Sequence, residues 1–152
     1  MILITYQSAY AQGSSKHFQH TLKTTAPASE VWRIWTDVAQ WHTWDTGLQQ
    51  ASLAGPFRKG AEGTLIANQG QKTKFVVTEV DEGTSYTFKT RLPLGSLQIT
   101  RSLVIEDNVV LFTHEVRFKG LTGGMFAKML GKGFREMLPG AMETIKRQAE
   151  AR

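Results

Sequence analysis

Six short segments with strand periodicity follow one another between residues 48 and 119, and they constrain the fold more than any other feature. Apolar and polar residues alternate in the segments 48–54, 62–69, 72–80, 84–91, 97–106 and 109–119, which is the period of a half-buried β-strand. Short turn sequences such as GPFRKG, DEG and DN separate these segments, so consecutive segments are expected to pair as antiparallel neighbours. The pattern predicts an antiparallel sheet whose apolar face needs a cover.

The segment before this region predicts one more strand and two short helices. Residues 17–25 also alternate between apolar and polar types. Pro27 then stands where the first residue of a short amphipathic helix would. Asp37 and Gln40 have the spacing of a capping box, which predicts a second short helix through Trp44.

The last thirty residues predict a long helix with one apolar face. From Gly123 onward the apolar residues recur at helical spacing, as Phe126, Leu130, Phe134, Met137, Leu138, Ala141 and Ile145. Pro139 lacks a backbone donor, which predicts a kink or break near residues 136–139. The predicted fold class is therefore α+β: a curved seven-stranded antiparallel β-sheet wrapped around a long C-terminal α-helix, with two short helices between strands 1 and 2.

Each of the last two predicted strands has one polar residue at a position where the apolar–polar alternation predicts an aliphatic one. If Asp107 and Asn108 form a two-residue hairpin turn, Arg101 faces His114. The other pairs on that face are then apolar against apolar: Ile105 with Val110, Leu103 with Phe112, Ile99 with Val116, and Leu97 with Phe118. Because facing side chains stand only ~5 Å apart at Cβ, the two polar residues are predicted to form one pair on the concave face.

Two interpretations of this pair follow from the sequence. A guanidinium in an apolar cavity is costly unless an anion or a hydrogen-bond acceptor meets it. In the functional interpretation, Arg101 binds a carboxylate, phosphate or enolate of a ligand, with His114 as a second donor or proton shuttle. His20 joins them if the first strand neighbours the last. In the structural interpretation, the aliphatic part of the Arg101 side chain packs along the cavity wall and its guanidinium reaches the cavity mouth or backbone carbonyls. His114 is then a core histidine whose hydrogen bonds are made within the protein.

Apolar residues complete the predicted ligand-binding set. The polar members are Arg101, His114 and His20. The apolar wall consists of Tyr86, Phe88, Leu103 and Phe112 from the strands and of Met125, Phe126, Met129, Leu130, Phe134 and Met137 from the first part of the last helix. Methionines adapt to irregular apolar shapes, as a ligand wall requires. The same stripe would also serve as an ordinary core.

Composition excludes several classes of function. A chain of 152 residues is long enough for one domain, predicted at 16–152 after a weakly specified leader, 1–15, that lacks the basic start of a signal peptide. The absence of cysteine excludes disulfides and thiolate chemistry, and the four histidines have no metal-ligand spacing, so no metal or cofactor is expected. The net charge of +5 is spread thinly, which argues against nucleic-acid binding. No apolar run approaches the ~20 residues of a membrane span, and a cytoplasmic protein is predicted.

Short motifs along residues 16–150 carry a family resemblance. In order, they are APxxEVW from Ala26, Asp37, WxxWD from Trp41, GPFxxG from Gly55, THEV from Thr113, and a terminal helix that ends in Glu150. This series resembles the polyketide cyclase/dehydrase and lipid-transport superfamily, the START-like or helix-grip (SRPBCC) proteins that include the major birch-pollen allergen. The resemblance implies a seven-stranded sheet that grips the last helix, with a cavity for an apolar or amphipathic ligand between them. Members include cyclases and carriers of lipids or hormones, and a fold alone does not choose among these.

Three functions remain open at the level of sequence. The leading one is binding, transport or sequestration of a small hydrophobic or amphipathic molecule, with or without an acidic group, and without a cofactor. The second is a cofactor-independent cyclase/dehydrase acting on a polyketide-like substrate, where Arg101 stabilises an oxyanion and His114 exchanges a proton. The third is a co-chaperone-like interaction protein whose interior is filled by side chains.

Overall fold

The seven predicted strands form a single antiparallel sheet. The computed structural model describes residues 14–151. The strands are β1 (His17–Thr24), β2 (Leu48–Leu53), β3 (Glu62–Ala67), β4 (Lys72–Asp81), β5 (Ser85–Leu92), β6 (Gly95–Glu106) and β7 (Val109–Gly120). Their order in the sheet is β1-β7-β6-β5-β4-β3-β2. Each turn from β2 to β7 therefore joins neighbours, as predicted, and β1 pairs with β7.

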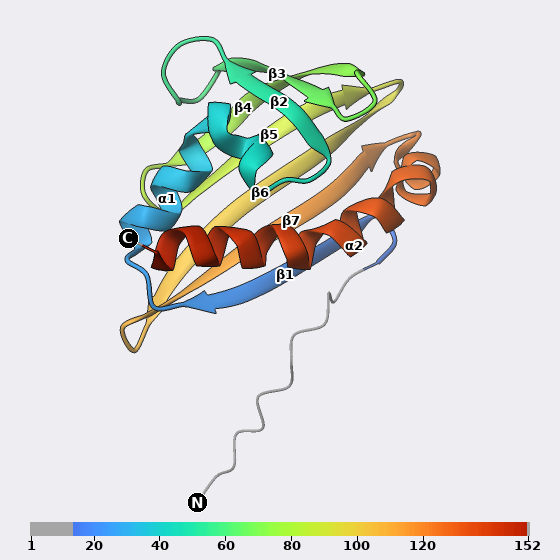
Figure 1. Cartoon of the computed structure of the whole chain (residues 1–152). Helices are drawn as coiled ribbons and strands as arrows, with labels where there is room; N and C mark the ends of the chain where they lie inside the picture. Colours follow the sequence, from blue (N-terminus) through green and yellow to red (C-terminus); the bar gives the residue numbers. More distant parts are fainter. Residues whose placement is uncertain (1–13, 152) are drawn as a thin grey trace, which may run out of the picture.

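Three helices cover the sheet. They are α1 (Ala28–Thr36), the 3₁₀-helix η1 (Val38–Thr43) and α2 (Gly123–Glu150). Figure 1 shows α2 lying along the concave side of the curved sheet, with its C-terminal end beside α1. The predicted fold class, the helix-grip arrangement, is confirmed.

Among the local predictions about the helices, the capping box at Asp37 is absent and the break allowed for at Pro139 does not occur. Asp37 precedes η1, but its side chain makes no capping hydrogen bond; its backbone carbonyl accepts a bond from the Gln40 N–H at 3.0 Å instead. α2 continues through Pro139 without a break. A proline removes one backbone hydrogen bond, while Leu138 and Ala141 on either side of it are buried against the sheet and hold the helix in place.

The β6–β7 hairpin has the predicted turn and register. Asp107 and Asn108 have φ of 51° and 64°, the left-handed values that a type I′ turn requires. Arg101 pairs with His114 across the two strands. Ile105, which was expected on the buried face, is 64% exposed because the tip of the hairpin extends past the end of α2 (Figure 1).

Buried residues form two clusters under the helices. We call the larger one the aromatic core; its ring residues are Trp35, Trp41, Trp44, Phe75, Tyr86, Phe88 and Phe112. A smaller second cluster lies under the first half of α2 and consists of Phe18, Leu97, Val116, Phe118, Ala127 and Leu138. Of the predicted leader, residues 1–13 lie outside the described part of the chain. Within the described part, no helix is both long enough and apolar enough to cross a membrane.

Candidate ligand-binding site

A row of polar side chains crosses four neighbouring strands. His20 on β1 pairs with His114 on β7, His114 pairs with Arg101 on β6, and Arg101 pairs with Tyr86 on β5. Because β1 does neighbour β7, all three polar residues of the predicted set stand at one level of the sheet.

Arg101 lies inside an aromatic cage. Its side chain is buried, with only 3% of the residue exposed. Its guanidinium carbon lies 4.6 Å from the ring centre of Trp41, 4.7 Å from that of Trp44, 5.1 Å from that of Phe88 and 5.7 Å from that of Tyr86. Cation–π attraction of this kind offsets part of the cost of taking a guanidinium out of water.

The hydrogen bonding of Arg101 is incomplete. Its Nη1 donates to the Tyr86 hydroxyl at 2.5 Å, and that hydroxyl donates to the carbonyl of Trp35 at 3.0 Å. Its Nε is buried and has no hydrogen-bond partner. Within residues 14–151, no carboxylate forms an ion pair with Arg101. A buried cation without a direct ion pair is therefore the central electrostatic feature of this site, and Asp45 is close enough to interact with its charge but not to pair with it.

His114 is a neutral core histidine. The Trp35 indole N–H donates to its Nε2 at 3.0 Å, so this nitrogen is an acceptor and the ring proton resides on Nδ1. Burial holds the pKa of His114 well below its ordinary value of 6.5, and the charges of Arg101 and His20 lower this pKa further. These features fit the structural interpretation of His114.

His20 lies at the less buried end of the row. Burial also lowers the pKa of His20, and this effect is partly opposed by the nearby carboxylate of Glu143 on α2.

A cavity of about 250 Å³ lies between the sheet and the first half of α2. Its polar lining residues are Asp45, Thr73, Thr90 and Arg101. The rest of its lining is Trp41, Gly47, Leu48, Leu65, Ala67, Phe88, Leu92, Leu97, Ile99, Leu130, Phe134 and Met137. Arg101 therefore meets the aromatic core on one side and a largely apolar cavity on the other.

Asp45 is the acidic residue of this cavity. One of its carboxylate oxygens accepts a hydrogen bond from the Gly47 N–H at 2.9 Å. Burial raises the pKa of Asp45, while the Gly47 hydrogen bond and the charge of Arg101 oppose the rise. A Cβ on Gly47 would lie 3.2 Å from the Met137 sulfur and 3.3 Å from Asp45 Oδ1, so the chain leading into β2 packs closely against α2 at this side of the cavity.

The structure brings together only part of the predicted ligand-binding set. Arg101, Phe88, Leu130, Phe134 and Met137 line the cavity. The other members lie elsewhere: Tyr86, Leu103 and Phe112 in the aromatic core, His114 beside them, Phe126 against the second cluster, His20 on β1, and Met125 and Met129 on the surface.

Sequence reasoning missed Trp41 and Asp45 as lining residues. Both belong to the WxxWD motif, which was taken above only as part of the family resemblance. Its two tryptophans, Trp41 and Trp44, are buried in the aromatic core. The signal that could have identified Asp45 as a lining residue is its carboxylate, placed directly after the core residue Trp44.

A larger hollow of about 620 Å³ lies between α1, η1 and the end of α2. Its lining is mostly polar and includes Arg33, Asp37, Gln40, Thr43 and Gln148. We assign the candidate ligand site to the smaller cavity, because apolar walls with a few converging polar groups are typical of small-molecule sites. No group of three or more histidine, aspartate or glutamate side chains in residues 14–151 could hold a metal ion.

Comparison with known proteins identifies the family. The family described as polyketide cyclase/dehydrase and lipid transport matches residues 15–150. The chain belongs to this family. The resemblance carried by the sequence motifs is thereby confirmed. Among curated protein sequences, none matches the chain significantly.

Solved structures share the fold of this family member at low sequence identity. A protein from Arthrobacter aurescens is 20% identical, with a TM-score of 0.70 over 96% of this chain and 94% of the other. A protein from Helicobacter pylori is 9% identical, with a TM-score of 0.73 over 98% and 97%. Norcoclaurine synthase from Thalictrum flavum, in complex with dopamine and hydroxybenzaldehyde, is 14% identical, with a TM-score of 0.65 over 87% and 84%. At these identities the likeness concerns the fold.

Proposed function

We propose that this protein binds a small, mainly apolar molecule with an acidic group, and that Arg101 anchors the acidic group. The observation that carries this proposal is a buried guanidinium at the wall of an apolar cavity, with no carboxylate at ion-pair distance among the described residues. A ligand carboxylate or phosphate would form the direct ion pair that Asp45 does not form, and would use donors such as the unpartnered Nε. Guanidinium groups bind these planar or tetrahedral anions through paired, charge-assisted hydrogen bonds.

The cavity limits the size and character of this ligand. Its volume of about 250 Å³ is below the ~300–1,000 Å³ that is usual for sites of drug-sized molecules. The ligand is therefore small, or part of it extends beyond the cavity mouth. Leu48, Leu65, Phe134 and Met137 contribute apolar walls, which favour an aliphatic or aromatic body through burial of its surface.

A second candidate function is catalysis of cyclisation or dehydration in the same cavity. Asp45 favours it, because a lining carboxyl whose pKa is raised by burial is suited to proton transfer beside a cation that can stabilise an oxyanion. In this mechanism Asp45 takes the role that sequence reasoning gave to His114, since His114 Nε2 is already engaged by Trp35. The likeness to norcoclaurine synthase, whose structure holds dopamine and hydroxybenzaldehyde, supports a small aromatic substrate for this candidate.

The third function considered from the sequence, an interaction protein with a filled interior, has less support. An apolar cavity that contains a charged wall residue is what a ligand site needs and what a purely structural core avoids. The cytoplasmic location remains a prediction.

Isothermal titration with a matched pair of probes tests the proposed binding. Octanoate and octanol share their alkyl chain and differ in the acidic group. We expect octanoate to bind the wild-type protein about tenfold or more tightly than octanol, because hydrogen bonds to charged groups contribute ~1.5–3 kcal/mol. In the Arg101→Met variant this preference should disappear, while Arg33→Met, in the larger polar hollow, should keep it. Equal affinity of the two probes for wild type, or a preserved preference in Arg101→Met, would reject the anchoring role.

A further inference from the structure

We propose that one end of this protein docks on the surface of an anionic lipid bilayer. This end, which we call the basic apolar end, consists of the β5–β6 turn (residues 93–94), the β7–α2 turn (residues 121–122), the first turns of α2 and the adjoining residues 14–16, 91–92, 95 and 119–120. The inference goes beyond the proposed function, because docking requires no ligand in the cavity.

Large apolar side chains are exposed to solvent at this end. Leu121 is 90% exposed, Leu94 75%, Met129 66% and Met125 52%. The two turns are joined, since the Leu121 N–H donates to the carbonyl of Leu94 at 3.0 Å. The exposed side chains therefore form one patch, and exposed apolar patches of this kind mark binding surfaces.

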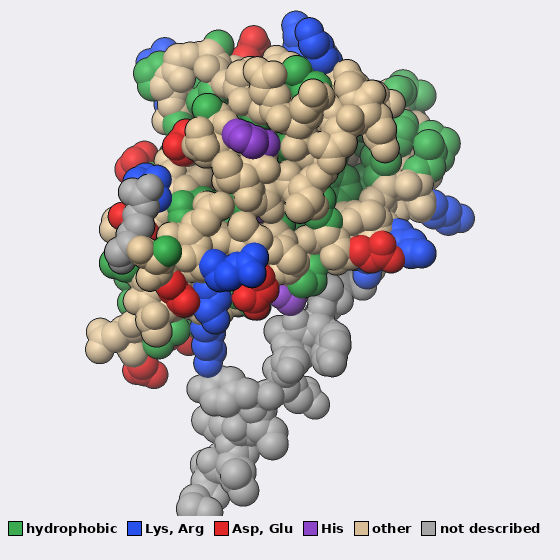
Figure 2. All heavy atoms as spheres, viewed as in Figure 1, with side chains coloured by type: hydrophobic (Ala, Val, Ile, Leu, Met, Phe, Trp, Pro, Cys, Tyr) green, Lys and Arg blue, Asp and Glu red, His purple; other side chains and the backbone are tan. Residues whose placement is uncertain are grey.

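Positive charge surrounds the patch. The segments that build this end, 14–16, 91–95 and 119–132, contain five basic residues and no acidic one; the basic residues are Lys16, Arg91, Lys119, Lys128 and Lys132. All five are exposed. Figure 2 shows hydrophobic and basic side chains together over the beginning of α2, at the right of the molecule.

Apolar and basic residues alternate along one face of α2. Met125, Lys128, Met129 and Lys132 follow one another at helical spacing and are all exposed. Lys132 lies 3.7 Å from Glu136 in an exposed ion pair, which leaves Lys128 directed to solvent beside the methionines. Helices that lie in a bilayer interface combine such apolar side chains with lysines that extend toward the lipid headgroups.

The basic apolar end is continuous with the cavity. Leu130 is 39% exposed and also lines the cavity, as does Leu92, which precedes the β5–β6 turn. Docking would therefore place the first turns of α2, one wall of the cavity, against the lipid surface.

Charge complementarity favours a bilayer over a second copy of the chain. A symmetric dimer through this face would bring the same cations of both copies together, and like charges in contact are unfavourable. An anionic lipid surface attracts each of these basic side chains.

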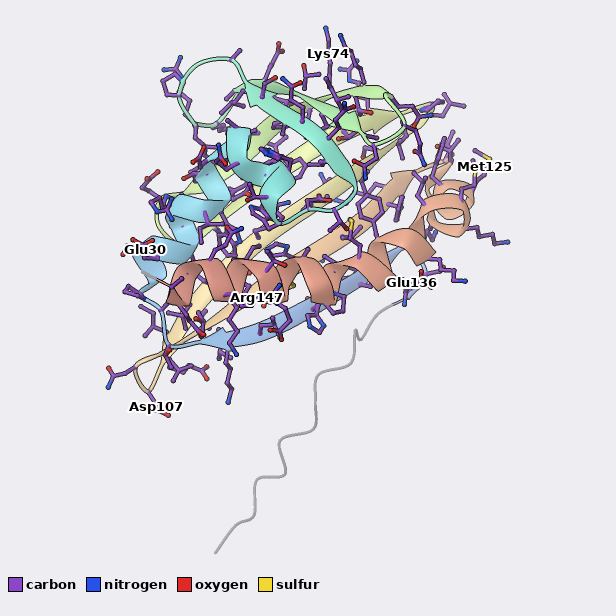
Figure 3. The ribbon with its side chains drawn as sticks, in the orientation of Figure 1. Glu30, Lys74, Asp107, Met125, Glu136 and Arg147 are labelled. Carbon is purple, nitrogen blue, oxygen red and sulfur yellow. The ribbon has the colours of Figure 1, made fainter. Side chains whose placement is uncertain are left out.

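The opposite end of the sheet supplies a matched control. Val104 and Ile105 are 54% and 64% exposed near the hairpin tip, but Glu106 and Asp107 follow them instead of lysines. Figure 3 shows Met125 and Asp107 at opposite ends of the molecule. If exposed apolar side chains alone sufficed for docking, both ends would contribute.

Vesicle flotation with the full chain tests this proposal. At low salt, we expect binding to mixed phosphatidylcholine and phosphatidylglycerol vesicles to be about tenfold or more tighter than to phosphatidylcholine alone, and to weaken as salt is added. Met125→Ser/Met129→Ser should weaken binding to the mixed vesicles about tenfold, and Val104→Ser/Ile105→Ser should leave it unchanged. All four substituted residues are more than half exposed, and circular dichroism would verify that both variants fold.

Three results would overturn docking at this end. They are equal or absent binding to the two kinds of vesicle, an equal loss in both double variants, and a dimer that depends on Met125 and Met129 without vesicle binding. The last would assign the patch to a second copy of the chain. Because no octanoate is present, failure here leaves the proposed ligand binding untouched, and a failed octanoate titration leaves docking untouched.

Discussion

The two halves of the concave face are built from one sheet but are filled differently. Under α1 and η1, the rings of the aromatic core pack against one another in edge-to-face and stacked pairs, with Trp35 edge to face at 6.2 Å from Tyr86 and 6.3 Å from Phe112 between ring centres. Under the first half of α2, the second cluster is small and leaves a cavity of about 250 Å³. The comparison shows that tryptophans from α1 and η1 fill and stabilise one half of the concave face, while the other half keeps a cavity.

Arg101 stands at the boundary between these halves. Trp41, Trp44 and Phe88 surround its guanidinium from the packed half, and the residue also lines the cavity. Its partner across the hairpin, His114, lies wholly within the packed half and is satisfied by Trp35. Two residues that face one another in register therefore have different environments.

The largest expected effect comes from removing a ring from the packed half. Trp35→Ala should lower the free energy of unfolding by about 3–5 kcal/mol, because it leaves a large void and deprives His114 Nε2 of its donor. Phe134→Ala, beside the existing cavity, should lower it by about 1–2 kcal/mol, nearer the average for point substitutions. Urea unfolding of both variants measures the difference. Equal losses would mean that the two halves are packed alike.

A smaller effect is expected from the protonation of His114. Because its pKa in the folded protein lies well below 6.5, the unfolded chain binds more protons than the folded one just below that pH. Protonation of His114 therefore does not affect the free energy of unfolding above pH 6.5. Below pH 6.5 it should lower the free energy of unfolding by up to about 1.4 kcal/mol per pH unit.

Urea midpoints measured from pH 7.5 down to pH 5 would measure this slope. Since the pKa of His20 is also lowered, His20→Gln should remove a small part of the slope and His114→Gln most of it. His42→Gln, an exposed residue of η1, should change nothing. A slope that survives in His114→Gln would contradict the buried neutral histidine.

The fold could be predicted from the sequence because its signals are periodic and local. Strand alternation, short turns and the stripe of the last helix each depend on near neighbours. The Asp107-Asn108 turn then determined the register that makes Arg101 and His114 face one another. Where prediction failed, tertiary packing outweighed a local rule, as in the unbroken helix at Pro139.

The candidate site was less predictable because a cavity is what packing leaves unfilled. Strand alternation placed Leu103 and Phe112 on the concave face, but it could not indicate that α1 and η1 would cover them. Helical spacing grouped Met125 and Met129 with Leu130. In the structure, Leu130 lines the cavity, whereas Met129, one residue earlier in the helix, lies on the surface. Asp45 was not included in the predicted ligand-binding set because it comes to the cavity from a loop distant in sequence.

The central claim is that Arg101 serves the ligand rather than the fold, and the stability of Arg101→Met tests it most directly. Replacing buried charged groups by apolar residues of similar size is often neutral or stabilising, so the unliganded variant should unfold at the same urea concentration as wild type or a higher one. Octanoate should raise the wild-type midpoint more than the variant's midpoint, because the variant keeps only the apolar part of the binding. A variant that is strongly destabilised without ligand, or one that octanoate stabilises as much as wild type, would contradict the account.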